Sequence, residues 1–285
     1  MKNNPIFIIG VSRTGSKFYM QLLNSHPDIC ILPELMFKHP HKKDLFSEVE
    51  LKLQENNLEA LVESLYLFKE RATYTNTIKL VDRELLKSNL ANLEYLKPYT
   101  VLNSILKLAA LSKNKKQYGA KFPIHYSYTA ELLHANKNSR IIYLTRDPRA
   151  IFYSDYRKKR DEQKNIGNNF PIKGMLLKPA VLFYTILEWK KSMTLFKKMK
   201  KSKLGERIKL FKFESIIIEE EQVIKSIAKF IDEKPDSFST ENMKIMDSSF
   251  SEKPKLNRWK NNLNTIEKLI FKISIGRKMK EYGYL

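Results

Sequence analysis

The chain has 285 residues, of which 42% are hydrophobic, and a formal net charge of +21 at pH 7. This length can bury one large core, and the lack of a Pro/Gly/Ser-rich linker or an internal repeat predicts one domain, residues 1–285, with insertions. The single cysteine, Cys30, excludes an internal disulfide, and the five histidines have no ligand-like spacing beyond His39 and His41. We therefore expect no structural zinc site and a reducing, cytoplasmic location.

The net positive charge admits three kinds of anionic partner: nucleic acid, an anionic membrane or a small anionic ligand. Lysine is spread along the whole chain, which is typical of a solvated surface, and no nucleic-acid-binding motif is present, so we expect no nucleic-acid partner. No apolar run approaches the length of a membrane span, and only five residues precede the first strand-like run. We also expect no membrane span and no signal peptide.

Short apolar runs predict strands, and amphipathic segments with apolar spacings of three and four predict helices. The strands are expected at residues 6–10, 28–33, 118–122, 140–145 and 207–213, and the helices at 44–70, 83–112, 125–136, 179–200 and 215–232. Their alternation predicts an α/β fold with three layers, α/β/α, around a central parallel sheet. Ligands bind such a sheet beyond the carboxyl ends of its strands.

The first strand-like run leads into a glycine-containing loop, in the sequence IFIIGVSRTGSKFYMQLL at residues 6–23. A triphosphate loop, G-x-x-x-x-G-K-[ST], has lysine directly after its second glycine, whereas here Ser16 separates Gly15 from Lys17. The backbone N–H groups from Ser12 to Lys17, at the start of a helix, still predict a concave anion site. On this motif alone, an ordinary turn between a strand and a helix remains an equal alternative.

A second anion site is predicted in RIIYLTRDPRAIFYSDYRKKR, residues 140–160. Asp147 and Pro148 are typical of a helix start, so Arg146 is expected at a strand end and Ser154 two turns into the following helix. An arginine and a hydroxyl at one crevice suit a dianionic phosphate. Alternatively, Arg146 and Asp147 form a surface ion pair.

Together these motifs resemble the sulfotransferases that use 3′-phosphoadenosine 5′-phosphosulfate, PAPS. In that family a G-x-x-[RK]-[ST]-G-[ST] loop holds the 5′-phosphosulfate, and an arginine in R-D-P-R with a serine eight positions later holds the 3′-phosphate. The resemblance implies a P-loop NTPase-like fold, PAPS as donor, PAP (3′-phosphoadenosine 5′-phosphate) as product and no required metal. It implies these donor-binding residues: Ser12, Arg13, Thr14, Gly15, Ser16, Lys17, Arg146, Ser154, Lys255 and Arg258.

The resemblance also implies catalytic roles for three residues. Arg13 stands at the family position that neutralises the leaving phosphate, and Lys17 departs from the hydroxyl residue that most members carry. Glu34, after the second strand-like run, is expected to be the general base, with His125 and His26 as the next candidates. Lys121, at the end of a strand, is expected near the transferred group, with Glu34 as a carboxylate partner.

The acceptor is expected to carry a hydroxyl group and to be a carbohydrate or glycolipid, by analogy with microbial family members. A largely helical insertion at about 36–117 matches no known segment, and a Gly- and Pro-containing stretch predicts a lid loop at about 160–179. Two other functions remain open at this point: a P-loop nucleotide kinase or NTPase, and a basic nucleic-acid-binding module. The sequence assigns no oligomeric state.

Overall fold

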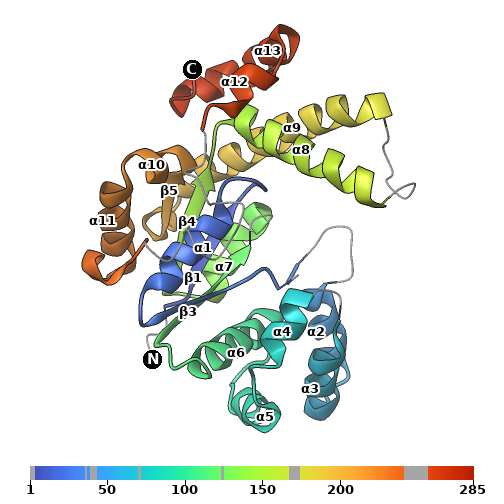
Figure 1. The fold of residues 1–285 in the computed structure, drawn as a ribbon. Coiled ribbons are helices and arrows are strands. Elements are labelled where there is room, and N and C mark those ends of the chain that lie inside the picture. Colours follow the sequence, from blue (N-terminus) through green and yellow to red (C-terminus); the bar gives the residue numbers. More distant parts are fainter. Residues whose placement is uncertain are drawn as a thin grey trace.

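The computed structural model describes residues 4–35, 37–38, 44–69, 72–122, 125–166, 174–240 and 256–285. Within them a five-stranded parallel sheet has the order β2-β3-β1-β4-β5 (Figure 1). The strands are β1 (Ile6–Gly10), β2 (Ile29–Leu32), β3 (Gln117–Phe122), β4 (Arg140–Thr145) and β5 (Ile208–Lys212). The predicted parallel α/β sheet is confirmed, with strand bounds that differ by one residue at most.

The sheet is buried on both faces because its strands carry apolar side chains in both directions. Ile6 and Ile8 of β1 belong to one core cluster, whereas Phe7 and Ile9 belong to the other. The first cluster is covered by α1 (Ser16–Ser25), α10 (Phe213–Ile218) and α11 (Glu220–Ile231). The second is covered mainly by α6 (Pro98–Leu111), α7 (Thr129–Ala135), α8 (Pro148–Ile166) and α9 (Leu177–Lys200). The fold therefore has the predicted three layers.

Five helices lie between β2 and β3 and form the lower part of the molecule in Figure 1. They are α2 (Leu45–Gln54), α3 (Leu58–Leu67), α4 (Ala72–Ile78), α5 (Arg83–Ala91) and α6. The prediction of one long helix at 44–70 and another at 83–112 was wrong, because each segment contains two shorter helices. Asn56 has a φ of 49° and Asn57 caps α3 by accepting from the Ala60 N–H, while Pro98 starts α6.

Two other predicted helices also divide. The segment 125–136 begins with a 3₁₀-helix, η1 (His125–Tyr128), before α7, and the segment 215–232 is split at Glu219 between α10 and α11. The predicted lid at 160–179 is helical at both ends, because α8 continues to Ile166 and α9 begins at Leu177. Residues 167–173 lie outside the described part, so the lid role stays a prediction.

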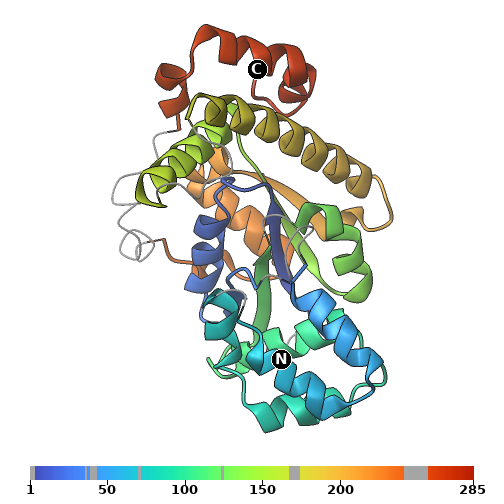
Figure 2. The same ribbon diagram turned by 90° about the vertical axis from the view of Figure 1, so that its right-hand side faces the viewer.

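The C-terminal segment adds two helices that we did not predict, α12 (Arg258–Asn262) and α13 (Thr265–Glu281). A capping box between Asn264 and Glu267 starts α13. Both helices lie beyond α8 and α9, at the opposite end of the molecule from the α2–α5 helices (Figures 1 and 2). Ion pairs of 2.6 Å, Lys178–Glu267 and Lys197–Glu281, hold α13 alongside α9.

Candidate active site

The loop between β1 and α1 has an unusual backbone. Arg13 has a φ of 70° and Gly15 a φ of 86°, so two residues adopt the left-handed region within three positions. Such alternation turns successive N–H groups toward one point and forms an anion-binding concavity. The buried Thr14 hydroxyl donates to the Val11 carbonyl (2.8 Å) and closes the loop from inside. A non-glycine residue at this φ costs energy, so the packing around the loop has to hold Arg13 in this conformation.

Gly15 is required by close packing as well as by its φ. A Cβ atom at this position would lie 2.1 Å from Cδ2 of Phe213, the first residue of α10. The loop is therefore pressed against the carboxyl end of β5, and a side chain at position 15 would push it away. Tight packing of this kind holds the backbone N–H groups in place.

The loop contacts both parts of the second predicted anion site. Nε of Arg13 donates to Oγ of Ser154 on α8 (3.0 Å), and Nη1 of Arg146 donates to the Arg13 carbonyl (3.2 Å). Three predicted donor-binding residues, far apart in the sequence, thus meet at the carboxyl edge of the sheet. Arg13 is exposed, whereas Arg146 and Ser154 are half-buried.

Arg146 is a partly buried cation with an unused donor. Its guanidinium lies over the Phe213 ring at 4.5 Å, and its buried Nε has no hydrogen-bond partner among the residues that the structure describes. Burial lowers the pKa of Arg146, an effect that the nearby Glu214 carboxylate opposes. A dianionic phosphate would accept a hydrogen bond from this Nε, and its negative charge would balance the positive charge of the guanidinium.

The alternative of a surface pair between Arg146 and Asp147 was wrong. Asp147 is buried, and its carboxylate binds Arg149 through Nε (2.9 Å) and Nη2 (2.8 Å). Glu214 accepts from the Asp147 backbone N–H (2.9 Å), which ties the start of α8 to the start of α10. The backbone of Arg146 is held by Trp189, whose Nε1 donates to its carbonyl (3.1 Å).

Sequence reasoning missed three residues that support this site. Phe213 and Glu214 directly follow β5, so the rule that sites form at carboxyl ends of parallel strands could have found them. Tyr284 carried no such signal. Its hydroxyl donates to Glu214 (3.3 Å), and its carbonyl accepts from Nη2 of Arg149 (2.6 Å). These two bonds join the C-terminal segment to the starts of α10 and α8.

The predicted catalytic residues lie at the same edge of the sheet. Lys121 is the penultimate residue of β3, is half-buried and is paired in register with Ile8 of β1. Glu34, also half-buried, follows the end of β2 by two residues, and its carbonyl accepts from the Thr73 hydroxyl of α4. The neighbouring strands β2, β3 and β1 thus carry Glu34, Lys121 and the loop on one side.

The other predicted residues have different positions. Ser12 is exposed on the loop, whereas the half-buried Ser16 and the exposed Lys17 are the first two residues of α1. Arg258 is exposed at the start of α12, a helix that rests on α8 through Trp259, whose ring lies 3.9 Å from the Arg149 guanidinium. Lys255 lies outside the described residues.

The two histidines named as alternative bases differ in position. His26 follows the last residue of α1, so it lies about 15 Å from the loop by helix length. Its Nδ1 accepts from the Asp28 N–H (3.1 Å). We therefore exclude His26. His125, in η1 just beyond β3, accepts from the Lys38 N–H through Nε2 (3.1 Å).

A row of polar side chains runs from Ser154 toward η1. Asp155 pairs with Lys159 on α8 (2.7 Å), and Nζ of Lys159 lies 5.2 Å from the centre of the Tyr184 ring on α9. One turn further along α9, Glu188 accepts a short hydrogen bond from the hydroxyl of Tyr126 in η1. We name these five residues, Asp155, Lys159, Tyr184, Glu188 and Tyr126, the polar wall.

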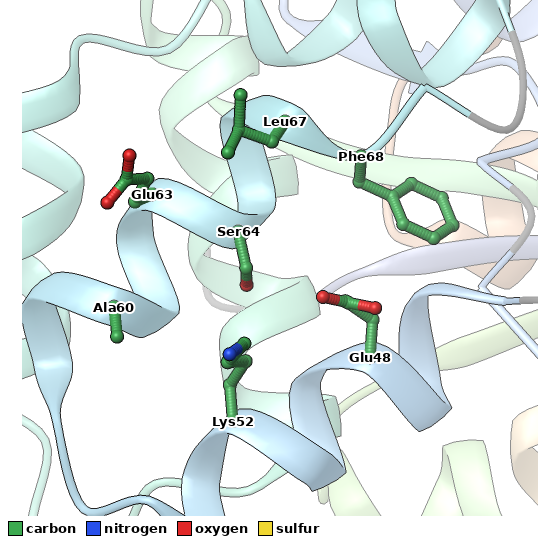
Figure 3. A pocket seen from close by; sticks show the side chains of 7 residues that line it. All are labelled: Glu48, Lys52, Ala60, Glu63, Ser64, Leu67 and Phe68. Atoms are coloured by element: carbon green, nitrogen blue, oxygen red, sulfur yellow. The ribbon is translucent and has the colours of Figure 1, made fainter.

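A separate pocket lies between α2 and α3 (Figure 3). It is lined by Glu48, Lys52, Ala60, Glu63, Ser64, Leu67 and Phe68. None of these residues belongs to the loop or to its contacts, so this pocket is distinct from the predicted donor site. In the described part of the chain no cluster of three or more His, Cys, Asp or Glu side chains is arranged to hold a metal ion.

A sequence model of the sulfotransferase family matches residues 5–236 of this chain. This range includes the loop, Arg146, Ser154 and Glu214. The chain belongs to the sulfotransferase family. The family match does not favour the two alternative functions of this sulfotransferase. These alternatives were a P-loop kinase or NTPase and a nucleic-acid-binding module.

Solved structures confirm the fold of the sulfotransferase. The STF9 sulfotransferase from Mycobacterium avium is 15% identical with a TM-score of 0.55, over 99% of this chain and 77% of that protein. Mouse SULT7A1, crystallised with PAP, is 13% identical with a TM-score of 0.54, over 100% of this chain and 90% of that protein. A comparison with curated proteins found no match. Within the described residues, no helix is long and apolar enough to cross a membrane.

Proposed function

We propose that this sulfotransferase takes a sulfuryl group from PAPS, transfers it to a hydroxyl acceptor and releases PAP. The observation that carries the proposal is the contact of the loop residue Arg13 with both Ser154 and Arg146. PAPS has two anionic ends, and this arrangement offers two adjoining anion sites. The PAP-bound mouse structure of the same fold supports this choice of donor. A cytoplasmic location remains part of the proposal.

The two ends of the donor are assigned as follows. The loop N–H groups and the N-terminus of α1 bind the 5′-phosphosulfate, where the helix dipole favours negative charge. Arg146 and Ser154 bind the 3′-phosphate, and the unused Nε of Arg146 fits that role. Lys255 and Arg258 are proposed to close over the same phosphate from the C-terminal segment.

In the transfer step, a sulfur–oxygen bond to the acceptor forms while the bond between sulfur and the phosphate oxygen of PAP breaks. Negative charge develops on the departing phosphate, and Arg13 is proposed to neutralise it, assisted by Lys17. Glu34 receives the acceptor proton, and Lys121 lies near the transferred group. As in phosphoryl transfer, positioning and electrostatic stabilisation supply most of the rate enhancement.

The acceptor is proposed to be a carbohydrate, free or as the headgroup of a glycolipid. The polar wall supports this class, because its carboxylates accept hydrogen bonds from sugar hydroxyls and the exposed Tyr184 ring offers a face for the C–H side of a sugar. The wall starts at Asp155, next to the donor residue Ser154 on α8. A sugar bound there would be close to the donor site.

Donor identity is tested by titrating the protein with PAP, with ATP–Mg and with duplex DNA in a calorimeter. We expect specific binding of PAP and weaker binding of ATP–Mg and of DNA. In a separate assay, the protein should transfer radiolabelled sulfate from PAPS to an acceptor. Tighter binding of ATP–Mg than of PAP would contradict the proposed donor.

Acceptor class is tested by measuring transfer to panels of glycans, peptides and phenols. Tyr184→Ala should raise the KM for the best glycan without changing PAP affinity. The matched control is Tyr95→Ala, a similarly exposed tyrosine between α5 and α6. Turnover of phenols or peptides without turnover of any glycan would contradict the carbohydrate assignment.

A further inference from the structure

The outer face of α13 is apolar where a surface helix is normally polar. The inner face is buried through Phe271, Ile275 and Met279. On the opposite side Ile266, Leu269 and Ile273 are 68%, 51% and 75% exposed. A surface helix usually shows charged and polar residues on the side away from the core. These three exposed aliphatic side chains depart from that pattern.

The three side chains form one continuous stripe. Their spacings of three and four residues place them next to one another on the helix surface. Ile273 is two residues, or about 200°, from the buried Ile275, and therefore lies almost opposite the core-facing side. Single exposed apolar residues are common, but a contiguous apolar stripe marks an interaction site.

Basic residues continue and border this stripe. Arg277 follows Ile273 by four residues and Lys280 follows Arg277 by three, and both basic side chains are exposed. Lys260 of α12 and Lys272 of α13 are exposed beside them. The acidic residues of α13, by contrast, are paired: Glu267 with Lys178 and Glu281 with Lys197, both at 2.6 Å. The outer face of α13 thus combines aliphatic side chains with an excess of basic over acidic side chains.

We propose that α13 docks this protein on an anionic lipid surface, with the stripe of Ile266, Leu269 and Ile273 at the boundary between headgroups and acyl chains. An exposed helix face with aliphatic residues and surrounding Lys and Arg binds such an interface through buried apolar area and attraction to anionic lipids. A second copy of the chain is a poorer occupant, because docking two such faces would bring together the basic rims of chains with a net charge of +21 each.

The position of α13 suits this role. It forms the outer edge of the molecule beyond α8 and α9 in both views (Figures 1 and 2). Just past its end, the Tyr284 carbonyl accepts from Arg149 of α8, close to the predicted donor site. A docked α13 would hold that site near the lipid surface. The docking proposal does not depend on which acceptor the enzyme uses.

The test measures binding of the full chain to vesicles by sedimentation, with phosphatidylcholine alone and with phosphatidylcholine containing phosphatidylglycerol. We expect binding to the anionic vesicles that weakens with added salt. The triple variant Ile266→Ser, Leu269→Ser, Ile273→Ser should lower the partition coefficient about 10- to 100-fold. Arg277→Gln and Lys280→Gln should each lower it about fivefold and reduce the salt dependence.

The matched control is the pair Leu51→Ser and Leu85→Ser, which removes aliphatic side chains that are 55% and 52% exposed on α2 and α5. Vesicle binding by this control should equal that of the unchanged protein, and all variants should keep their Tm and their PAP affinity. Equal vesicle binding by the triple variant, or no binding of the unchanged protein to anionic vesicles, would overturn the proposal. So would a dimer in ultracentrifugation that the triple variant dissociates, since the occupant would then be a second copy.

Discussion

The Arg13 side chain bridges the loop after β1 and the helix after β4, because its Nε donates to Oγ of Ser154 across 3.0 Å. These residues are 141 positions apart in the chain. Their contact means that the two predicted anion sites are one continuous surface. Donor binding and catalysis should therefore respond together to changes at Arg13, and separately to changes at residues that serve one end of the donor.

Arg146→Ala should weaken PAP binding by about 2 to 4 kcal/mol, the scale for removing one partner of a buried charged hydrogen bond. Adenosine 5′-phosphosulfate, which lacks the 3′-phosphate, should lose almost no affinity. Isothermal titration with both ligands checks this. Arg83→Ala is the control, because Arg83 forms an exposed ion pair with Glu59 on the helical insertion and should not affect either ligand. Equal losses for both ligands would show that Arg146 does not bind the 3′-phosphate.

Glu34→Gln should lower turnover by about 10²- to 10⁴-fold and leave PAP affinity nearly unchanged, because the base contacts the acceptor proton and not the nucleotide. Arg13→Ala should reduce both quantities. Transfer rates measured against pH, with calorimetry for PAP, separate the two variants. If Glu34→Gln keeps its turnover and its pH profile, Glu34 is not the base, and His125→Gln is the next variant to measure.

Gly15→Ala should destabilise the fold and abolish donor binding. An L-residue at a φ of 86° costs about 1 to 2 kcal/mol, and the contact of 2.1 Å with Phe213 adds an overpacking cost of about 1 to 3 kcal/mol. Urea unfolding measures the stability. The double variant with Phe213→Leu should recover part of the loss, whereas no recovery would mean that the backbone conformation alone sets the cost.

Glu214→Gln should change how stability depends on pH. Burial raises the pKa of Glu214 above its usual value of 4.5, although the Asp147 N–H and Arg146 oppose the shift. A carboxyl group whose pKa is higher in the folded state stabilises the fold below its unfolded pKa, and this contribution is lost as the pH rises through the folded pKa. The contribution of Glu214 to the free energy of unfolding should therefore decline from about pH 4.5 upward.

The introduced glutamine cannot ionise, so the free energy of unfolding of the unchanged protein, minus that of the Glu214→Gln variant, should decrease over the same pH range. Urea unfolding of both proteins between pH 4 and 7 checks this difference. Parallel curves would mean that Glu214 titrates alike in the folded and unfolded chains.

The positions of the strands along the chain could be predicted from the sequence because they depend on local patterns. Continuous apolar runs such as Ile6–Gly10 identify strands that are buried on both faces. The loop spacing and the offset of eight positions from Arg146 to Ser154 indicated the family, since both are short-range features. Helix breaks were less predictable: Asn57 caps α3 within a segment whose apolar periodicity continues past it.

What the sequence could not determine is which distant groups share one site, because that depends on how β1, β4, β5 and the C-terminal segment pack. The contact of Gly15 with Phe213, the bond from Tyr284 to Glu214 and the exposed face of α13 all arise between segments that are far apart in the chain. Apolar periodicity shows that a helix such as α13 has an apolar side, but only packing decides which apolar side chains are buried. On α13 the core covers Phe271 and leaves Ile273 to the solvent.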